Sequence, residues 1–270
     1  MNIIQQPDML SLSMNLKNFI IGSSRQTTFT LKAGDKELVS QVYAPDENGV
    51  MEIDIHEIVH SFLSYSLKDI GEVYQQTNLV ADFTAVIDST EITFRVIRSG
   101  VDRLTDSPTN FLTQNFLTWQ PNVKPVTYYS PEFLTYYAVV AGTVKLRAYF
   151  TDESGTVKSQ TDYTVTELMP GIAYTMPLQY SVVAGWLEHK LPAYYDVWVE
   201  NTSGQRLTYI QRYYAEDMRS EQEQWILFEN SLGGVDTFRA YGNTVFNGEH
   251  THNIAEIDEF FSEYRVRSEE

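Results

Sequence analysis

The sequence contains no cysteine among its 270 residues, which excludes a disulfide framework and any metal site built on thiolates. No apolar run approaches the length that a membrane-spanning helix needs. The first ten residues carry no basic cluster, and polar residues together with Pro7 interrupt their apolar stretch, so a secretory signal peptide is not expected. These absences predict a protein kept in the cytoplasm unless it leaves as part of a particle released by lysis.

Basic residues are scarce: 19 Lys and Arg stand against 36 Asp and Glu, for a formal net charge of −17. A chain with this charge would be repelled by nucleic-acid phosphates and by anionic lipid, so neither is expected as a partner. The sequence also lacks the glycine-rich loops that cradle phosphates and the G-x-S-x-G motif of serine hydrolases. We therefore expect a soluble protein with no cofactor.

What the sequence has is alternation. Hydrophobic residues make up 43% of the chain, enough for extensive cores, and many of them alternate with polar residues as in half-buried strands. The expected strands are 9–16, 27–31, 37–43, 50–55, 79–87, 91–97, 133–140, 143–151, 156–166, 194–200 and 207–214, with a helical turn at 178–185.

The length exceeds that of a typical single domain. Four of the nine prolines fall between 108 and 131, which places a boundary near 100–122. We predict a mostly β fold with two antiparallel β-sandwich-like domains at 1–105 and 123–246, and one short helix in the first. Residues 106–122 would form a crossover and 247–270 an acidic tail. The tail is compatible with a short amphipathic helix or with a loosely ordered terminus.

The predicted helix contains the sequence His56-Glu57-Ile58-Val59-His60, a literal H-E-x-x-H. On a helix, His56 and His60 would face the same way and could hold zinc, with Glu57 as a general base. Asp54 is expected to cap the helix, which places His56 in the first turn, and no convincing third ligand follows. We predict a capped surface helix without metal and keep a zinc hydrolase as the weaker alternative. A second pair, His250 and His252, is a still weaker metal candidate.

One turn pattern recurs between the expected strands. Residues 46–49, 152–155 and 201–204 all read [DN]-x-[NS]-G. Asp or Asn at the first position bonds the backbone two residues on, and the final Gly accepts a left-handed angle. We expect a hairpin at each position.

The second half is rich in tyrosine, and several tyrosines occur as doublets. Within a strand, one ring of a doublet should point inward and its neighbour outward. Tyr is also favoured at protein interfaces. The residues predicted to contact a partner are Tyr128, Tyr129, Tyr194, Tyr195, Tyr213 and Tyr214.

The stretch from Glu223 to Gly242 carries the most specific signal. Two apolar runs, starting at Trp225 and at Val235, flank a break that contains Asn230 and the pair Gly233-Gly234. This layout predicts two strands joined by a short loop, with the glycines supplying backbone angles that other residues avoid. We expect the loop, Asn230 to Asp236, to fix this hairpin. Its structural residues would be Trp225, Asn230, Gly233, Gly234, Asp236 and Phe238.

The pattern W-[IL]-L-F-x-N-S-L-G-G-x-D-T-F over this stretch resembles a strand–loop–strand found in tail-associated, β-rich structural proteins of phages and prophages of Bacteroides-like bacteria. The resemblance implies a non-enzymatic structural or adaptor component of a tail, at the baseplate or tail tip. It would be located in the virion or the host cytoplasm. Its partners would be other tail proteins and further copies of itself. A carbohydrate-binding or adhesin module, using the exposed aromatic rings, is the first alternative.

Overall fold

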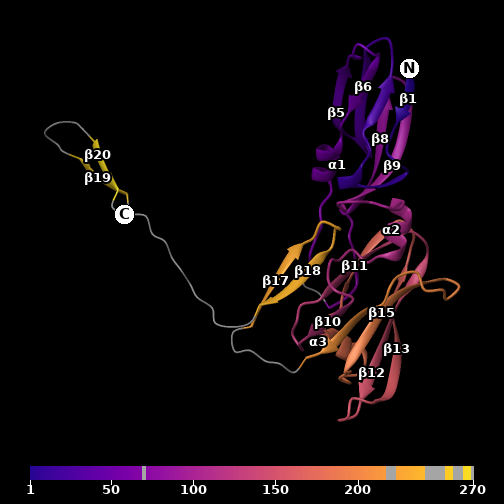
Figure 1. The fold of residues 1–270 in the computed structure, drawn as a ribbon, viewed down its shortest axis with the longest axis vertical. Helices are drawn as coiled ribbons and strands as arrows, with labels where there is room; N and C mark the ends of the chain where they lie inside the picture. The colour runs from indigo at the N-terminus through magenta and orange to yellow at the C-terminus, as the bar shows by residue number, and fades with distance from the viewer. Residues whose placement is uncertain (69–70, 217–222, 241–252, 258–263, 269–270) are drawn as a thin grey trace.

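The computed structural model describes residues 1–68, 71–216, 223–240, 253–257 and 264–268. The fold is mostly β with several antiparallel sheets, as the alternation predicted. Figure 1 shows an elongated body in which the N-terminal half lies above the second half, with helix α2 (Pro108–Gln114) between them.

The N-terminal half consists of two sheets that enclose one core. The first sheet has the order β1-β3-β6 (Asn2–Gln5, Phe19–Gly22 and Val50–Ile53). The second has the order β2-β9-β8-β4-β5 (Leu10–Leu12, Thr90–Ile97, Val80–Ile87, Thr27–Ala33 and Lys36–Tyr43). Phe19, Phe29 and Phe94 pack between them edge to face. A 3-10 turn (Ser13–Asn15) and helix α1 (His56–Phe62) complete this half, and α1 buries Val59 in the same core.

The turn at 46–49 has the predicted geometry but does not make a hairpin. The strand that follows it, β6, pairs antiparallel with β3, whereas the strand before it, β5, forms the edge of the other sheet. The turn therefore connects two sheets. Phe19 and Ile21 of β3 and Met51 and Ile53 of β6 bury their side chains in one core, which favours this pairing over a local one.

The second half repeats the two-sheet plan. Its larger sheet has the order β10-β16-β15-β12-β13 (Val123–Val126, Gln211–Ala215, Tyr194–Asn201, Gly142–Thr151 and Val157–Leu168). The smaller has the order β11-β14-β7 (Phe133–Ala138, Ile172–Pro177 and Tyr74–Gln75), so β7 reaches from the N-terminal half of the sequence into a sheet of the second half. Helix α3 (Tyr180–Trp186) covers part of this core at the predicted position.

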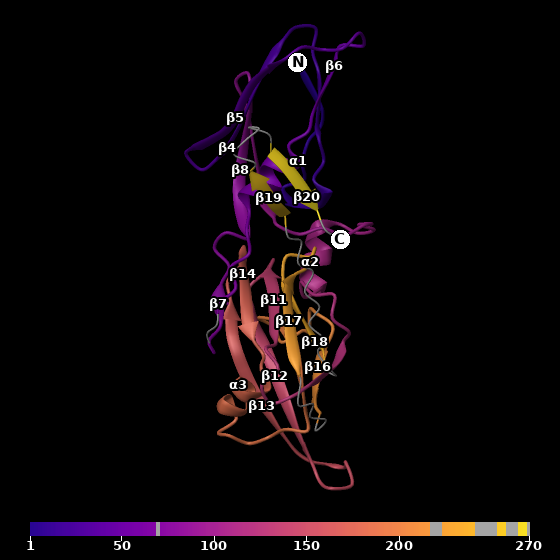
Figure 2. The ribbon, with the colours of Figure 1, turned by 90° about the vertical axis from the view of Figure 1, so that its left-hand side faces the viewer.

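Two hairpins remain. Strands β17 (Gln224–Glu229) and β18 (Val235–Ala240) pair antiparallel and lie along the second half (Figure 2). Strand β18 contacts β11. Strands β19 (Asn253–Ile257) and β20 (Tyr264–Ser268) form another hairpin, set apart from the body in Figure 1. These strands correct the prediction of a short helix in the C-terminal tail.

A third apolar cluster lies at the junction of the two halves. It combines residues from the N-terminal half, the α2 segment, the smaller sheet of the second half and the loop between β17 and β18. Its buried members include Leu12, Leu79, Leu117, Tyr137 and Leu232. The loop of the β17–β18 hairpin is therefore part of the packing that joins the two halves.

Candidate interaction site on the β17–β18 hairpin

The loop between β17 and β18 is organised by the side chain of Asn230. Its Oδ1 accepts hydrogen bonds from the backbone N–H groups of Leu232 (2.9 Å) and Gly234 (3.2 Å), and Gly233 has φ 90°. Asp46, Asp152 and Asn201 each accept the same two bonds in the three turns predicted from sequence. The device therefore occurs a fourth time. The relaxed pattern [DN]-x-x-G would have found it at 230–233.

The two glycines of this loop serve different purposes. A Cβ at Gly233 would stand 2.0 Å from the carbonyl oxygen of Arg98, and one at Gly234 would stand 2.1 Å from that of Leu117. Gly233 also needs its positive φ, as predicted, whereas Gly234 is required by close packing alone. The sequence revealed the glycine pair but not the backbone that it packs against.

Further polar contacts hold the hairpin to the body. The buried Asp236 carboxylate accepts from the Thr118 hydroxyl at 2.5 Å and from the Trp119 backbone N–H at 3.1 Å. The Thr237 hydroxyl donates to the Pro131 carbonyl oxygen at 2.5 Å. Since Thr118, Asp236 and Thr237 are buried, the bonds fix the position of β18 strongly.

A buried ion pair lies beside β18. Lys124 Nζ donates to Glu132 Oε2 at 2.7 Å and to the Thr237 carbonyl oxygen at 2.8 Å. Burial raises the pKa of Glu132 to about 7, against the opposing effect of the Lys124 ammonium, and the Asp236 carboxylate adds to the rise. The pair joins β10, the start of β11 and β18 in one network.

One face of the hairpin packs on the body and the other is exposed. Leu227 and Val235 belong to the junction cluster, and Trp225 is half-buried on the same face. Ile226 and Phe238 are cross-strand partners on the opposite face, where Ile226, Phe228 and Phe238 are 53%, 47% and 59% exposed. We call these three residues, together with Trp119 at the loop end (59% exposed), the outer face.

The outer face is next to an open sheet edge. Strand β17 pairs with β18 and with no other strand among the described residues. Its outer edge therefore presents unpaired backbone groups beside large apolar side chains. Such an edge is a template for pairing with another chain. A cluster of exposed large apolar residues next to it is typical of an interaction surface.

The tyrosine doublets follow the in-and-out rule only in part. Tyr195 and Tyr213 are fully buried and stack at 5.2 Å, so the structure corrects their assignment as contact residues for a partner. Their neighbours Tyr194 and Tyr214 are partly exposed, as expected from strand geometry. Tyr128 and Tyr129 do not lie in a strand, and both are exposed.

The histidines of helix α1 make separate contacts. His56 Nδ1 lies 2.7 Å from Asp54 Oδ1, and His60 Nδ1 lies 2.9 Å from Ser13 Oγ. Burial, assisted by the positive charge of Arg98, lowers the pKa of His60. In the part of the chain that the structure describes, no group of three or more His, Cys, Asp or Glu side chains is placed to hold a metal ion. His250 and His252 lie outside the described residues.

Comparisons with known proteins assign no family. No helix within the described residues is long and apolar enough to cross a membrane. No protein-family model matches the chain. A search of curated proteins likewise finds no match.

Proposed function

We propose that this protein is a non-enzymatic structural or adaptor component that works by docking onto further copies of itself. The observation that carries the proposal is the outer face: Ile226, Phe228 and Phe238 are exposed on a hairpin that is rigidly anchored to both halves of the body. Rigid presentation lowers the entropy lost on association, so an anchored apolar strand pair suits assembly.

The C-terminal hairpin of a second copy is the occupant that we propose for this face. A two-stranded hairpin is marginally stable by itself in water, and β19–β20 pairs with no other strand in the described ranges. It follows β18 after residues 241–252, a connection that spans at most about 40 Å when fully extended. Addition of this hairpin to the β17 edge would extend a two-stranded sheet and place further strands beside Ile226 and Phe228 of the outer face.

A head-to-tail contact of this kind is heterologous, because each copy offers two different surfaces. These are the β19–β20 hairpin, which we call the arm, and the outer face. Repetition closes into a ring where the rotation allows and otherwise continues as a filament. The resemblance of the Trp225–Phe238 segment to tail-associated proteins of phages and prophages supports a setting in a tail. In a tail, copies of this protein would assemble into rings, and other tail proteins would bind to those rings.

Light scattering behind a sizing column tests the proposal with two variants, each of which lacks one side of the proposed contact. One variant lacks residues 253–270 and so retains only the face, and the other carries Ile226→Ser and Phe238→Ser and so retains only the arm. We expect the full chain to associate with increasing concentration and each variant to be monomeric. An equimolar mixture of the two should give a dimer that grows no further.

Val42→Ser is the matched control, because Val42 is 57% exposed on edge strand β5, far along the chain from the hairpin. It should leave association unchanged. Higher salt should strengthen association, since every copy carries a formal charge of −17. A full chain that stays monomeric at high concentration, or an arm deletion that still associates, would overturn the proposal.

A further inference from the structure

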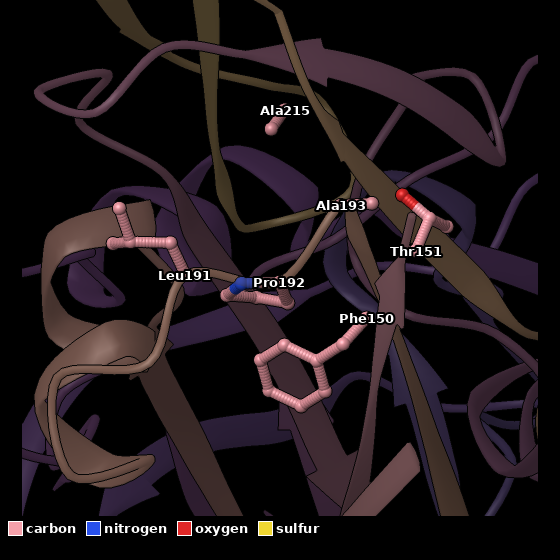
Figure 3. A pocket seen from close by; sticks show the side chains of 6 residues that line it. All are labelled: Phe150, Thr151, Leu191, Pro192, Ala193 and Ala215. Atoms are coloured by element: carbon pink, nitrogen blue, oxygen red, sulfur yellow. The ribbon is translucent and has the colours of Figure 1, made fainter. Parts of the chain in front are cut away.

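A second surface feature lies on the opposite side of the β17–β18 hairpin from the outer face. It is a cleft of about 470 Å³ whose walls include Tyr128, Tyr129, Tyr180 and Trp225. A smaller cleft of about 330 Å³ adjoins it, and Leu191 and Ala215 line both. Figure 3 shows this smaller cleft, with the Phe150 ring and Pro192 on one side and the Thr151 hydroxyl and Ala193 on the other.

Three tyrosine rings that line the larger cleft contact one another in a row. Tyr128 and Tyr129 meet edge to face with centroids 5.0 Å apart, and Tyr128 contacts Tyr180 at 5.9 Å. Tyr180 is buried, and its hydroxyl donates to the Pro192 carbonyl oxygen at 2.7 Å. Tyr128, which is 44% exposed, therefore packs on the fixed ring of Tyr180, and Tyr129, which is 76% exposed, packs on Tyr128.

Two carboxylates stand beside the rings. Glu216 and Glu223 both line the cleft, and both form ion pairs with the side chain of Arg239, which is only 11% exposed. A carboxylate has about four lone-pair positions, so each group can accept further hydrogen bonds while it is paired with arginine. The arginine also fixes the orientation of both carboxylates and offsets part of their charge.

We propose that these adjoining clefts bind a neutral oligosaccharide. The C–H faces of a sugar ring pack on aromatic faces, whose centres carry partial negative charge, and vicinal hydroxyls donate to carboxylates. The volumes fall in the range of small-ligand sites, and two adjoining clefts suit more than one ring. The net charge of −17 disfavours an anionic glycan.

An apolar peptide is a poorer fit to the same site. Its side chains would need an enclosed apolar pocket, whereas here the most exposed ring, Tyr129, stands next to charged groups. The proposed site uses Trp225 on the inward side of the hairpin, whereas self-association uses Ile226 and Phe238 on the outer face. The two proposals can therefore fail separately.

Saturation-transfer NMR and tryptophan fluorescence test the site with full-length protein. The probes are maltohexaose, cellohexaose and mannohexaose, each titrated to about 10 mM so that dissociation constants in the millimolar range can be measured. Hexagalacturonate serves as an anionic comparator and an acetylated apolar hexapeptide as the peptide comparator. We expect saturable binding of at least one neutral hexasaccharide and none of the two comparators.

Two substitutions locate the binding. Tyr129→Ala and Glu223→Gln should each raise the dissociation constant for the sugar roughly 10-fold, in line with the loss of one stacked ring or one charged acceptor. Phe238→Ala, an exposed aromatic on the other face, should leave it unchanged while weakening self-association. Circular dichroism melts confirm that each variant is folded.

The proposal would be overturned by any of three results. The first is the absence of saturable binding by every neutral hexasaccharide. The second is binding that neither Tyr129→Ala nor Glu223→Gln alters. The third is binding of the hexapeptide in preference to the sugars, which would mark the clefts as a peptide site.

Discussion

The side-chain amide of Asn230 donates to the Leu117 carbonyl oxygen at 3.1 Å, while its Oδ1 closes the loop to which it belongs. One side chain thus satisfies the loop between β17 and β18 and ties it to the segment that follows α2. The backbone N–H of Gly100 adds a bond to the Ser231 carbonyl oxygen at 2.7 Å from the other side of the junction. The loop between β17 and β18 is therefore a clamp on the connection between the two halves.

Asn230→Ala should lower the free energy of unfolding by about 2–3 kcal/mol, because three hydrogen bonds are lost at a half-buried site. Asn230→Asp keeps the acceptor but replaces the donor to Leu117 with an oxygen, and should cost about half as much. Asn201→Ala is the control: Asn201 closes the same kind of loop through hydrogen bonds that are exposed, so water can replace them. Urea denaturation measures all three, and equal losses at positions 230 and 201 would contradict the clamp.

Gly234→Ala should destabilise the protein by about 3 kcal/mol or more. The added Cβ would stand 2.1 Å from the Leu117 carbonyl oxygen, and backbone cannot move aside as a flexible side chain can. Gly185→Ala provides the contrast, because a Cβ there meets no atom within 4 Å and Gly185 lies in helix α3. It should be neutral or slightly stabilising. Thermal unfolding of the two variants separates close approach from a general effect of removing glycine.

Local patterns in the sequence predicted many of the strands but not how some of them are used. The alternation that marks β4, β8 and β9 reflects one buried face, and these strands, like edge strand β5, lie where they were expected. β11 differs because both of its faces are covered: Tyr136 belongs to the core of the second half and Tyr137 to the junction cluster. The in-and-out rule fails there for that reason.

The candidate site was predictable only in its local part. Asn230, Gly233 and Gly234 are visible in the sequence as a loop signal, and the exposed residues of β17 follow from strand alternation. The partners of the loop, Arg98 and Leu117, are more than a hundred residues away, and no local pattern connects them. The cleft is likewise assembled from segments far apart in the chain, so sequence periodicity could not reveal it.

Tyr195 and Tyr213 offer a matched test of buried hydroxyls. The Tyr195 hydroxyl donates to the Leu178 carbonyl oxygen at 2.6 Å, whereas that of Tyr213 has no hydrogen-bond partner among the described residues. Tyr195→Phe should therefore destabilise the protein by about 1 kcal/mol, and Tyr213→Phe should stabilise it by a similar amount. Both rings remain in place, so urea midpoints compare the hydroxyls alone. Equal destabilisation by both would show that the Tyr213 hydroxyl is satisfied, for example by water.

The buried Glu132–Lys124 pair beside β18 should make the stability of the protein depend on pH. Around Glu132, the groups that interact electrostatically with its carboxyl are Lys124 on β10, Asp236 on β18, Tyr195 on β15 and Tyr213 on β16. Burial raises the pKa of Glu132 from 4.5 to about 7. The folded state thus binds more protons than the unfolded state between these two values, so stability falls as pH rises through that window.

The stability that Glu132 contributes is fully present below about pH 4.5 and is lost by about pH 7.5. A pKa shift of this size corresponds to about 3 kcal/mol of stability. His60 acts in the opposite direction below pH 6.5, because its lowered pKa makes the unfolded state the better proton acceptor. Glu132→Gln retains the His60 contribution and removes that of Glu132. The stability difference between the variant and the parent should therefore shift in favour of the variant from pH 5 to pH 8. Urea unfolding across this range measures that difference, and two parallel stability curves would show that Glu132 titrates with the same pKa in both states.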